Sequence, residues 1–288
     1  MMQIRYQTYS QFHNKDPVVG SDFIRVNQLL KYWPEAALYK YGEFPDVMIF
    51  TKVFSAYDYK FPNHFENIKI LDICDPMWLE GMDVAETARA MDAVTCPTES
   101  MAQFMRQFNT PVYVIPDRWD IDPKVLKPPR EHIDKAKTVV WYGYAHNAEI
   151  LKPAIRTINE LGLNLKIISN DDPILYRFDD RPKEEYYQFV KYSNDTILQE
   201  LQLADFALLP IDYRPIGRFK SNNKTTHAIL AGLPVATNGD ELRSFLEPEA
   251  RKKYMLEQYD IIKSEYDVRK SVDQMKEIIA EAQKKRND

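Results

Sequence analysis

The sequence predicts an α/β protein made of two parallel-sheet domains, and two features of the chain indicate this. Short apolar runs of strand length alternate with helical patterns from end to end, which is typical of parallel sheets covered by helices. One proline-rich and charged stretch, 116–137, interrupts the alternation and is interpreted as an interdomain linker. A chain of 288 residues is long enough for two ordinary domains.

The half of the chain before this stretch begins with a predicted strand and continues in alternation. Ser21 is the expected N-cap of the first helix, which has an apolar face, and Pro34 ends that helix. The strands are expected at 2–8, 47–50, 68–74, 93–96 and 112–115, and the helices at 23–33, 84–91 and 100–108.

The alternation restarts after the stretch and ends in a charged helical tail. The strands are expected at 138–142, 165–169, 206–210 and 235–237, and the helices at 148–161, 194–203, 225–231 and from 241 onward. Val268, Val272, Met275 and Ile279 form one apolar stripe on the last helix, so this helix should pack against a domain. The predicted domains are 1–130 and 131–265, followed by a terminal helix at 266–288.

Composition and charge restrict the classes of function. The net charge of −5 gives no overall electrostatic reason to expect nucleic-acid binding, although a local basic cleft is compatible with it. The first 13 residues lack the apolar core of a secretory signal, and no run approaches the roughly 20 apolar residues of a membrane-spanning helix. Cys74 and Cys96 lie in or beside apolar runs and are interpreted as buried free thiols. We therefore expect a cytoplasmic protein.

The common catalytic and cofactor motifs are missing from the sequence. It contains no G-x-S-x-G, no Walker A pattern and no G-x-G-x-x-G. The five histidines and two cysteines do not have metal-ligand spacing, and Asp171-Asp172 is the nearest approach to an Asp-x-Asp metal motif. We expect neither a metal site nor a bound cofactor.

Residues 218–237 are the most informative stretch of the chain. Polar and basic residues precede a short apolar helix, Gly232 stops the helix, and Pro234 prevents it from resuming before a buried strand. Backbone amides at a helix start beside lysines suit a phosphate or a diphosphate, although a solvated Asn- and Lys-rich turn that merely caps a helix would look similar. The residues expected to bind the phosphates are Arg218, Lys220, Ser221, Asn222, Asn223, Lys224 and Thr225.

Several segments, taken in order, resemble those of GT-B glycosyltransferases of the retaining family 4 type. The matching segments are GSDFIRVNQLLKYW (20–33), MDAVTCPTESMAQFM (91–105), WYGYAHNAEILKPAI (141–155), LQLADFALLPI (201–211) and KSNNKTTHAILAGLPVATN (220–238). The resemblance implies two Rossmann-like domains facing a cleft, with the last helix crossing back to the N-terminal domain. It also implies transfer of a sugar from a nucleotide-diphosphate sugar without a bound metal.

The chain departs from that family at two positions. Many members carry two glutamates eight residues apart, and the matching positions here are Phe219 and His227. The resemblance implies that His227 could still hydrogen-bond the donor ribose, whereas Phe219 cannot act as an acid. A catalytically inactive protein that binds a nucleotide or a sugar is therefore the alternative function.

Further donor contacts are expected where the second domain begins. Gly143 follows a predicted buried strand, so a ligand can approach the backbone closely there. His146 and Asn147 stand at the expected start of the next helix and could hold a phosphate or a sugar hydroxyl. Asn147 could equally serve only as the cap of that helix.

Candidate catalytic residues lie at strand ends in the first domain. Asp75 follows a predicted buried strand and is the first candidate for the base that activates an acceptor, while Asp72 more simply anchors a turn. Asp22, at the first loop–helix junction, is the second candidate, although it could serve only the helix dipole. Gly20, Ser21 and His64 are the other residues expected on the acceptor side.

The acceptor itself is left open by the sequence. Residues 39–65 are rich in tyrosine and phenylalanine with interleaved lysines, which would suit a glycan or a modified nucleic-acid base. A lipid-linked sugar is a further possibility, and such a run can also be only a sheet edge and a surface loop. No obligate protein partner is indicated.

Overall fold

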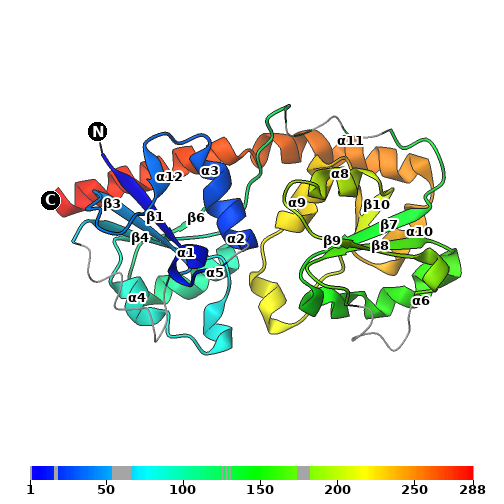
Figure 1. The fold of residues 1–288 in the computed structure, drawn as a ribbon, viewed down its shortest axis with the longest axis horizontal. Coiled ribbons are helices and arrows are strands. Elements are labelled where there is room, and N and C mark those ends of the chain that lie inside the picture. The colour runs from blue at the N-terminus through cyan, green and yellow to red at the C-terminus, as the bar shows by residue number, and fades with distance from the viewer. Residues whose placement is uncertain are drawn as a thin grey trace. The chain divides into compact units, whose positions relative to one another are not determined.

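The computed structural model describes residues 2–15, 19–53, 66–124, 126, 129, 131–173 and 182–287, and these form two compact units (Figure 1). Unit 1 consists of Met1–Asp120, Arg214–Ser221 and Tyr266–Asp288, and unit 2 of Ile121–Tyr213 and Asn222–Glu265. Each unit contains one sheet in which every strand pair is parallel. The predicted α/β class with two parallel sheets is confirmed.

The sheet of unit 1 has the strand order β2-β1-β3-β4-β5-β6. Its strands are β1 (Ile4–Thr8), β2 (Ala36–Leu38), β3 (Val47–Thr51), β4 (Ile68–Asp72), β5 (Ala93–Cys96) and β6 (Val112–Val114). Its helical segments include α1 (Tyr9–Phe12), α2 (Gly20–Asp22), η1 (Phe23–Asn27), α3 (Gln28–Leu30), η3 (Met77–Glu80), α4 (Ala85–Arg89), α5 (Glu99–Met105), η4 (Arg106–Phe108), η7 (Pro215–Phe219) and α12 (Val268–Asn287). The sequence did not predict β2, which is a three-residue strand at the sheet edge.

The first long helix starts earlier than the sequence predicted. Its first turn, α2, begins at Gly20 after Val19, and no side chain caps it. The prediction that Ser21 caps this helix is therefore wrong, because Ser21 lies inside the first turn. The helix passes through the π-helical turn η1 into α3 and ends before Pro34, as expected from the missing proline N–H.

The C-terminal helix α12 packs onto the sheet of unit 1. The predicted stripe is buried in one apolar cluster with residues of β1 and α3, including Ile4, Tyr6 and Leu29. Burial of an apolar stripe of this kind provides the main stabilisation of an amphipathic helix. The last helix thus belongs to unit 1, although it follows unit 2 in the sequence.

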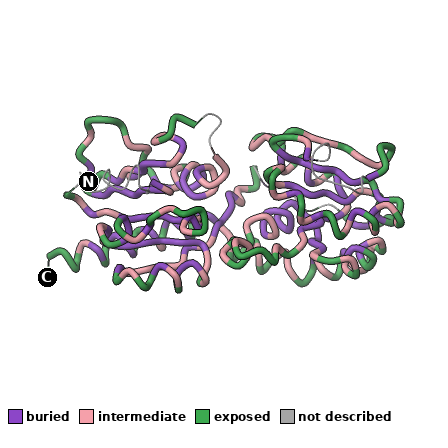
Figure 2. Tube along the Cα trace, turned by 90° about the horizontal axis from the view of Figure 1, so that it is seen from below, coloured by how far each residue is buried: buried purple, intermediate pink, exposed green. Residues whose placement is uncertain are grey.

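The sheet of unit 2 has the strand order β11-β10-β7-β8-β9. Its strands are β7 (Thr138–Tyr142), β8 (Asn164–Ser169), β9 (Tyr187–Lys191), β10 (Phe206–Leu208) and β11 (Val235–Ala236). Its helical segments include η5 (Ala145–Leu151), α6 (Lys152–Leu161), η6 (Glu184–Tyr186), α8 (Ile197–Gln202), α9 (Asn223–Leu230), α10 (Gly239–Ser244) and α11 (Pro248–Glu265). In both units the buried residues follow the strands and the inner sides of the helices (Figure 2).

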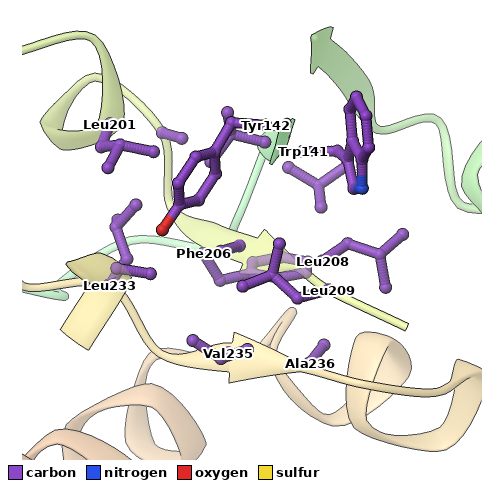
Figure 3. Packing of buried hydrophobic residues seen from close by; sticks show 14 of the residues in the cluster. Trp141, Tyr142, Leu201, Phe206, Leu208, Leu209, Leu233, Val235 and Ala236 are labelled. Atoms are coloured by element: carbon purple, nitrogen blue, oxygen red, sulfur yellow. The ribbon is translucent and has the colours of Figure 1, made fainter. Parts of the chain in front are cut away.

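The core of unit 2 is built around its central strands. Trp141 and Tyr142 of β7 pack with Phe206 and Leu208 of β10 and with residues of α8 and β11 (Figure 3). Strand β9 was not predicted, because none of its five residues is buried and it therefore has no run of buried apolar residues.

The proline-rich stretch 116–137 is not a free linker throughout. Asp117 to Asp120 are buried in unit 1, where Trp119 exchanges backbone hydrogen bonds with Tyr266 and Val268. Further along, His132 is buried in unit 2, with its Nε2 3.0 Å from the carbonyl oxygen of Gly232. Long-range contacts of this kind hold irregular backbone in place without producing a periodic pattern of apolar residues. The sequence therefore predicted a linker here.

A buried arginine joins several elements of unit 1. Arg25 in η1 donates to both oxygens of Asp72 at the end of β4, at 2.6–3.0 Å. It also donates to the carbonyl oxygen of Ile115 and, at 2.7 Å, to Asp117. Thr95 completes the set with a hydrogen bond to Asp72. Removing one member of such a buried ion network leaves uncompensated charge behind.

The substitution Arg25→Met should therefore destabilise unit 1 strongly. It leaves Asp72 and Asp117 buried without their cation, and breaking a buried pair in this way costs about 3–5 kcal/mol. The measurement is urea unfolding followed by tryptophan fluorescence in a Trp141→Phe background, in which the remaining tryptophans all lie in unit 1.

Arg106→Met is the matched control, because the Arg106–Glu99 pair of the same unit is about half exposed. Such a pair contributes at most about 1 kcal/mol. Equal and small effects of the two substitutions would contradict a central role for Arg25.

His227 lies in α9 and is only 4% exposed. Burial lowers its pKa to about 3, far below the ordinary value of 6.5. Between these two values the unfolded chain binds a proton that the folded chain does not, so stability falls as the pH falls through this window.

Unit 2 should consequently lose about 2 kcal/mol of unfolding free energy between pH 7 and pH 5 through His227 alone. The loss should disappear from the pH dependence of His227→Gln, measured by urea unfolding at both values. A variant that keeps the full slope would show that other groups cause it.

Candidate functional site

The topology of unit 2 has a switch point at the carboxyl ends of β7 and β10. The chain leaves β7 toward β8 on one side, whereas it leaves β10 toward β11 on the other side. In parallel α/β sheets, ligands bind where neighbouring strands send their connections in opposite directions. The segments after β7 and after β10 are therefore the first places to search for a site.

Gly143 follows β7 directly and its conformation requires glycine. Its φ is +152°, and a Cβ there would lie 3.2 Å from Cζ2 of Trp141 and 3.4 Å from Nζ of Lys224. The missing side chain thus lets a lysine side chain approach the strand end closely. The structure confirms that Gly143 lies at a strand end and brings it together with Lys224.

Lys224 lies in the first turn of α9 and is held against β7 at two places. Its carbonyl oxygen accepts a hydrogen bond from the hydroxyl of Tyr142, and its ammonium lies 5.7 Å from the ring centroid of Trp141. Helix α9 begins at Asn223, two residues earlier than predicted, and its N-cap Asn222 forms no side-chain cap. Thr225 is also in the first turn, whose backbone N–H groups point out of the helix. The cation and the positive end of this helix therefore lie together.

The residues after Gly143 form a short turn of 3-10 helix. His146 lies in η5, where its Nε2 is 3.1 Å from Nδ2 of Asn147, and its ring stacks on Tyr144 at 5.7 Å. The N-cap of η5 is Tyr144, so the alternative in which Asn147 caps the helix is wrong. Both predicted residues therefore lie in the loop that follows the strand end.

The other half of the predicted phosphate-binding segment belongs to unit 1. Lys220 Nζ lies 3.1 Å from Asp75, and Ser221 donates its hydroxyl proton to Asp117 at 2.5 Å. Phe219 packs edge-on against Trp78 at 5.2 Å. Arg218 is exposed, with its guanidinium 5.8 Å from the ring of Phe219. The predicted segment thus divides at 221/222, where unit 1 ends and unit 2 resumes.

Asp75 is the centre of a charged cluster in unit 1. Lys52 Nζ lies 2.7 Å from one carboxylate oxygen and Lys220 Nζ 3.1 Å from the other. Burial alone would raise the pKa of Asp75, but Lys52 and then Lys220 outweigh it and lower the pKa to about 2. The side chain is 28% exposed, so this permanent carboxylate remains accessible to a ligand.

Asp22, the second candidate base, is completely buried. One of its oxygens accepts the backbone N–H of Ser10 at 2.7 Å, and burial raises its pKa against the opposing hydrogen bonds of Ser10. Its neighbours Gly20 and Ser21 are partly exposed in α2. In this conformation Asp22 holds the loop after β1, and a ligand cannot reach it.

The expectations for Asp72 and for the aromatic stretch 39–65 have different outcomes. Asp72 does not anchor a turn, because its carboxylate pairs with Arg25 and Thr95 in the buried network. His64 and the aromatic residues 54–65 lie outside the described residues. Tyr41 and Phe44, from the same aromatic stretch, are exposed.

Lys52 was missed by the sequence analysis. It follows the buried strand β3 in the same way that Asp75 follows β4, so the strand-end rule could have found it. Its φ of +56° is unusual for a residue other than glycine.

Across the described ranges, no three His, Cys, Asp or Glu side chains are grouped so that they could hold a metal ion. Among the helices of that part of the chain, none combines the length and apolar character needed to cross a bilayer.

The fold is similar to that of several solved glycosyltransferases. The T4 phage β-glucosyltransferase matches with a TM-score of 0.63 at 12% identity, over 96% of this chain and 99% of that one. AviGT4, a glycosyltransferase involved in avilamycin A biosynthesis, matches with a TM-score of 0.54 at 11% identity, over 97% and 98%. TarM matches with a TM-score of 0.56 at 10% identity, over 81% of this chain but only 54% of TarM, so the chain spans about half of that protein.

Sequence comparison adds no relative. No protein-family profile and no curated protein matches the chain. At identities of 10–12% the structural matches show the fold alone. Together with the two parallel sheets, they establish that this chain has the GT-B glycosyltransferase fold, as the sequence predicted.

Proposed function

We propose that the protein is a glycosyltransferase that moves a sugar from a nucleotide-diphosphate sugar to an acceptor. The observation that carries the proposal is the position of Lys224 in unit 2. Its ammonium lies beside Gly143 at the end of β7, and its backbone lies in the first turn of α9. A lysine and a helix N-terminus at this point of a parallel sheet are the arrangement that binds phosphate groups.

The proposed chemistry needs stabilisation of the leaving nucleoside diphosphate. As the bond between the sugar and the phosphate breaks, negative charge develops on the phosphate oxygen. Lys224 and the first amides of α9 would stabilise this charge, which is a preorganised electrostatic contribution. The proposal thus assigns the role of a divalent metal to protein groups, with no cofactor beyond the donor substrate.

Asp75 is the proposed partner of the acceptor hydroxyl. With a pKa of about 2 it stays ionised throughout the physiological range, so it can always accept a hydrogen bond from a hydroxyl. Its accessibility favours it over the buried Asp22. Asp22 is proposed instead to position the loop of Gly20 and Ser21.

An inactive nucleotide- or sugar-binding protein is the second candidate, and one observation favours it. Phe219 packs in an apolar cluster, and His227 is buried and neutral at physiological pH, so neither replaces the two glutamates as a carboxylate. Binding of a nucleotide sugar without transfer or hydrolysis would support this candidate.

The acceptor is proposed from three classes, which are a glycan, a lipid-linked sugar and a modified DNA base. The matching T4 phage protein is described as a DNA-modifying enzyme, and it aligns over nearly the whole of both chains. TarM has been solved with UDP and an α-GlcNAc-glycerol. The cytoplasm remains the proposed location, because Cys74 and Cys96 are free thiols.

The donor site can be tested by calorimetric titration with UDP, GDP, ADP and CMP. We expect one nucleoside diphosphate to bind, and Lys224→Met to weaken it roughly 10- to 100-fold through the loss of a charge-assisted hydrogen bond. Gly143→Ala should weaken binding as well, because a side chain is strained at a φ of +152° and the new Cβ would lie 3.2 Å from Cζ2 of Trp141, beside Lys224.

Lys253→Met provides the control for charge, since this lysine of unit 2 is 78% exposed on α11. It should bind the nucleotide as the wild type does. If no nucleotide binds to the wild-type protein, the glycosyltransferase proposal fails.

Salt dependence distinguishes a DNA acceptor from an uncharged glycan. Binding of a duplex that contains modified bases should weaken steeply between 50 and 200 mM salt, because lysines and arginines release counterions from phosphates. Binding of a neutral oligosaccharide should change little. A flat response to salt with duplex DNA would exclude DNA as the acceptor.

A further inference from the structure

The two lysines that pair with Asp75 differ in how far their side chains are exposed to solvent. Lys52 is 13% exposed and Lys220 is 40% exposed, and they bind opposite oxygens of the same carboxylate. The inference drawn from this difference rests on the proposed function, since Lys220 belongs to the segment assigned to donor phosphates.

Lys52 is held firmly in unit 1. It follows β3 with a φ of +56°, its backbone N–H donates to the carbonyl oxygen of Asp72 at 3.0 Å, and its ammonium lies 5.2 Å from the ring centroid of Tyr9. A left-handed conformation at a lysine persists only where the surroundings enforce it. Tyr9 and Lys52 also follow β1 and β3, the neighbouring strands whose connections leave in opposite directions in this sheet.

Lys220 can leave Asp75 without disturbing its own backbone. The residues on both sides are anchored independently, by the packing of Phe219 on Trp78 and by the hydrogen bond from Ser221 to Asp117. Thr98 also donates to the carbonyl oxygen of Phe219 at 3.3 Å. Only the long lysine side chain would need to rotate, and it is already partly in solvent.

We infer that Lys52 is a fixed positioning residue for Asp75, and that Lys220 is an exchangeable partner that a phosphate-bearing ligand takes away from Asp75. A phosphate dianion offers Lys220 more charge than one carboxylate does, and lysine binds phosphate as a point charge. Binding of the donor then leaves Asp75 with a single cation.

The consequence is a carboxylate that becomes a stronger hydrogen-bond acceptor only when the donor is present. With both lysines in place, Asp75 is a weak base; with Lys52 alone, its affinity for a proton rises. Among the described groups, Asp22 also acts electrostatically on Lys52, and the exchange leaves Asp22 in place. The acceptor hydroxyl is thereby activated after the donor has bound, which disfavours activation of stray water beforehand.

A double-mutant cycle on UDP affinity tests the exchange. If UDP competes with Asp75 for Lys220, Asp75→Asn removes the competitor and should tighten UDP binding by roughly threefold, the size expected for one partly exposed ion pair. In a Lys220→Met background the same substitution should have no effect. Calorimetry at neutral pH measures all four proteins.

The outcomes separate this inference from the proposed function. If UDP binds to the wild type but Asp75→Asn leaves its affinity unchanged or weaker, the exchange is overturned while the nucleotide site stands. Equal tightening in both backgrounds would show a general charge effect and would also overturn the exchange. Absence of UDP binding to the wild type, with every other nucleotide also failing to bind, would refute the proposed function itself.

Asp75→Asn removes the carboxylate that pairs with Lys52, whose side chain is mostly buried, so this variant could fail to fold. A second measurement covers that case. The carboxyl resonances of ¹³C-labelled aspartate in the wild-type protein should include one that shifts on addition of UDP. Lys220→Met should move the same resonance without UDP and abolish its response. An unchanged spectrum in the presence of bound UDP would contradict the exchange.

Discussion

The buried guanidinium of Arg25 is the interaction on which the arrangement of the strand ends of unit 1 depends. It binds Asp72 at the end of β4 and both Ile115 and Asp117 just beyond β6. These strand ends are not neighbours in the sheet, since β5 lies between them. A cation placed in the interior must be matched by fixed anions, so its presence fixes the relative positions of the loops that supply them.

The network also reaches a segment that is remote in sequence. Asp117 uses its second oxygen to accept the hydroxyl of Ser221, so one carboxylate ties Arg25 to residues 214–221. That segment would otherwise be an irregular loop of unit 2, and loops without buried contacts are mobile. The partners of Phe219 and Ser221 in unit 1 help to give its basic residues a defined place.

In unit 2, three residues hold the flexible side chain of Lys224 at the end of strand β7. Gly143 removes the Cβ that would occupy the space, and the Tyr142 hydroxyl fixes the backbone of Lys224. The Trp141 ring then provides an apolar surface below the ammonium. Fixing the lysine before a ligand arrives reduces the ordering cost of binding.

The periodicity of apolar residues predicted most of the fold. Strands such as β3 and β7 are continuous apolar runs because both faces of a parallel sheet are covered. Strands β2 and β9 could not be found in this way, since β2 has only three residues and none of the residues of β9 is buried. The stripe of α12 was visible because amphipathic helices repeat their apolar residues every three or four positions.

The candidate site was predictable only in part, because some of its contacts join residues that are far apart in the sequence. Gly143, Lys224 and Asp75 follow local rules, since each lies at a strand end or a helix start. Arg25 follows none: it stands in a helix that reads as amphipathic, and its partners Asp72 and Asp117 are 47 and 92 residues away. Nothing in the local pattern distinguishes this arginine from one that faces solvent.

Phe219 illustrates how a departure from a family pattern can be a structural feature. An apolar residue replaces an expected acid there, and the structure shows a second requirement at that position, the contact with Trp78. A carboxylate at this position would be desolvated against the indole, which is unfavourable. The contact with Trp78 therefore favours an apolar side chain at this position, and Phe219 also anchors the backbone of its neighbours. Asp75, a carboxylate of the same unit, lies instead where two lysines compensate its charge.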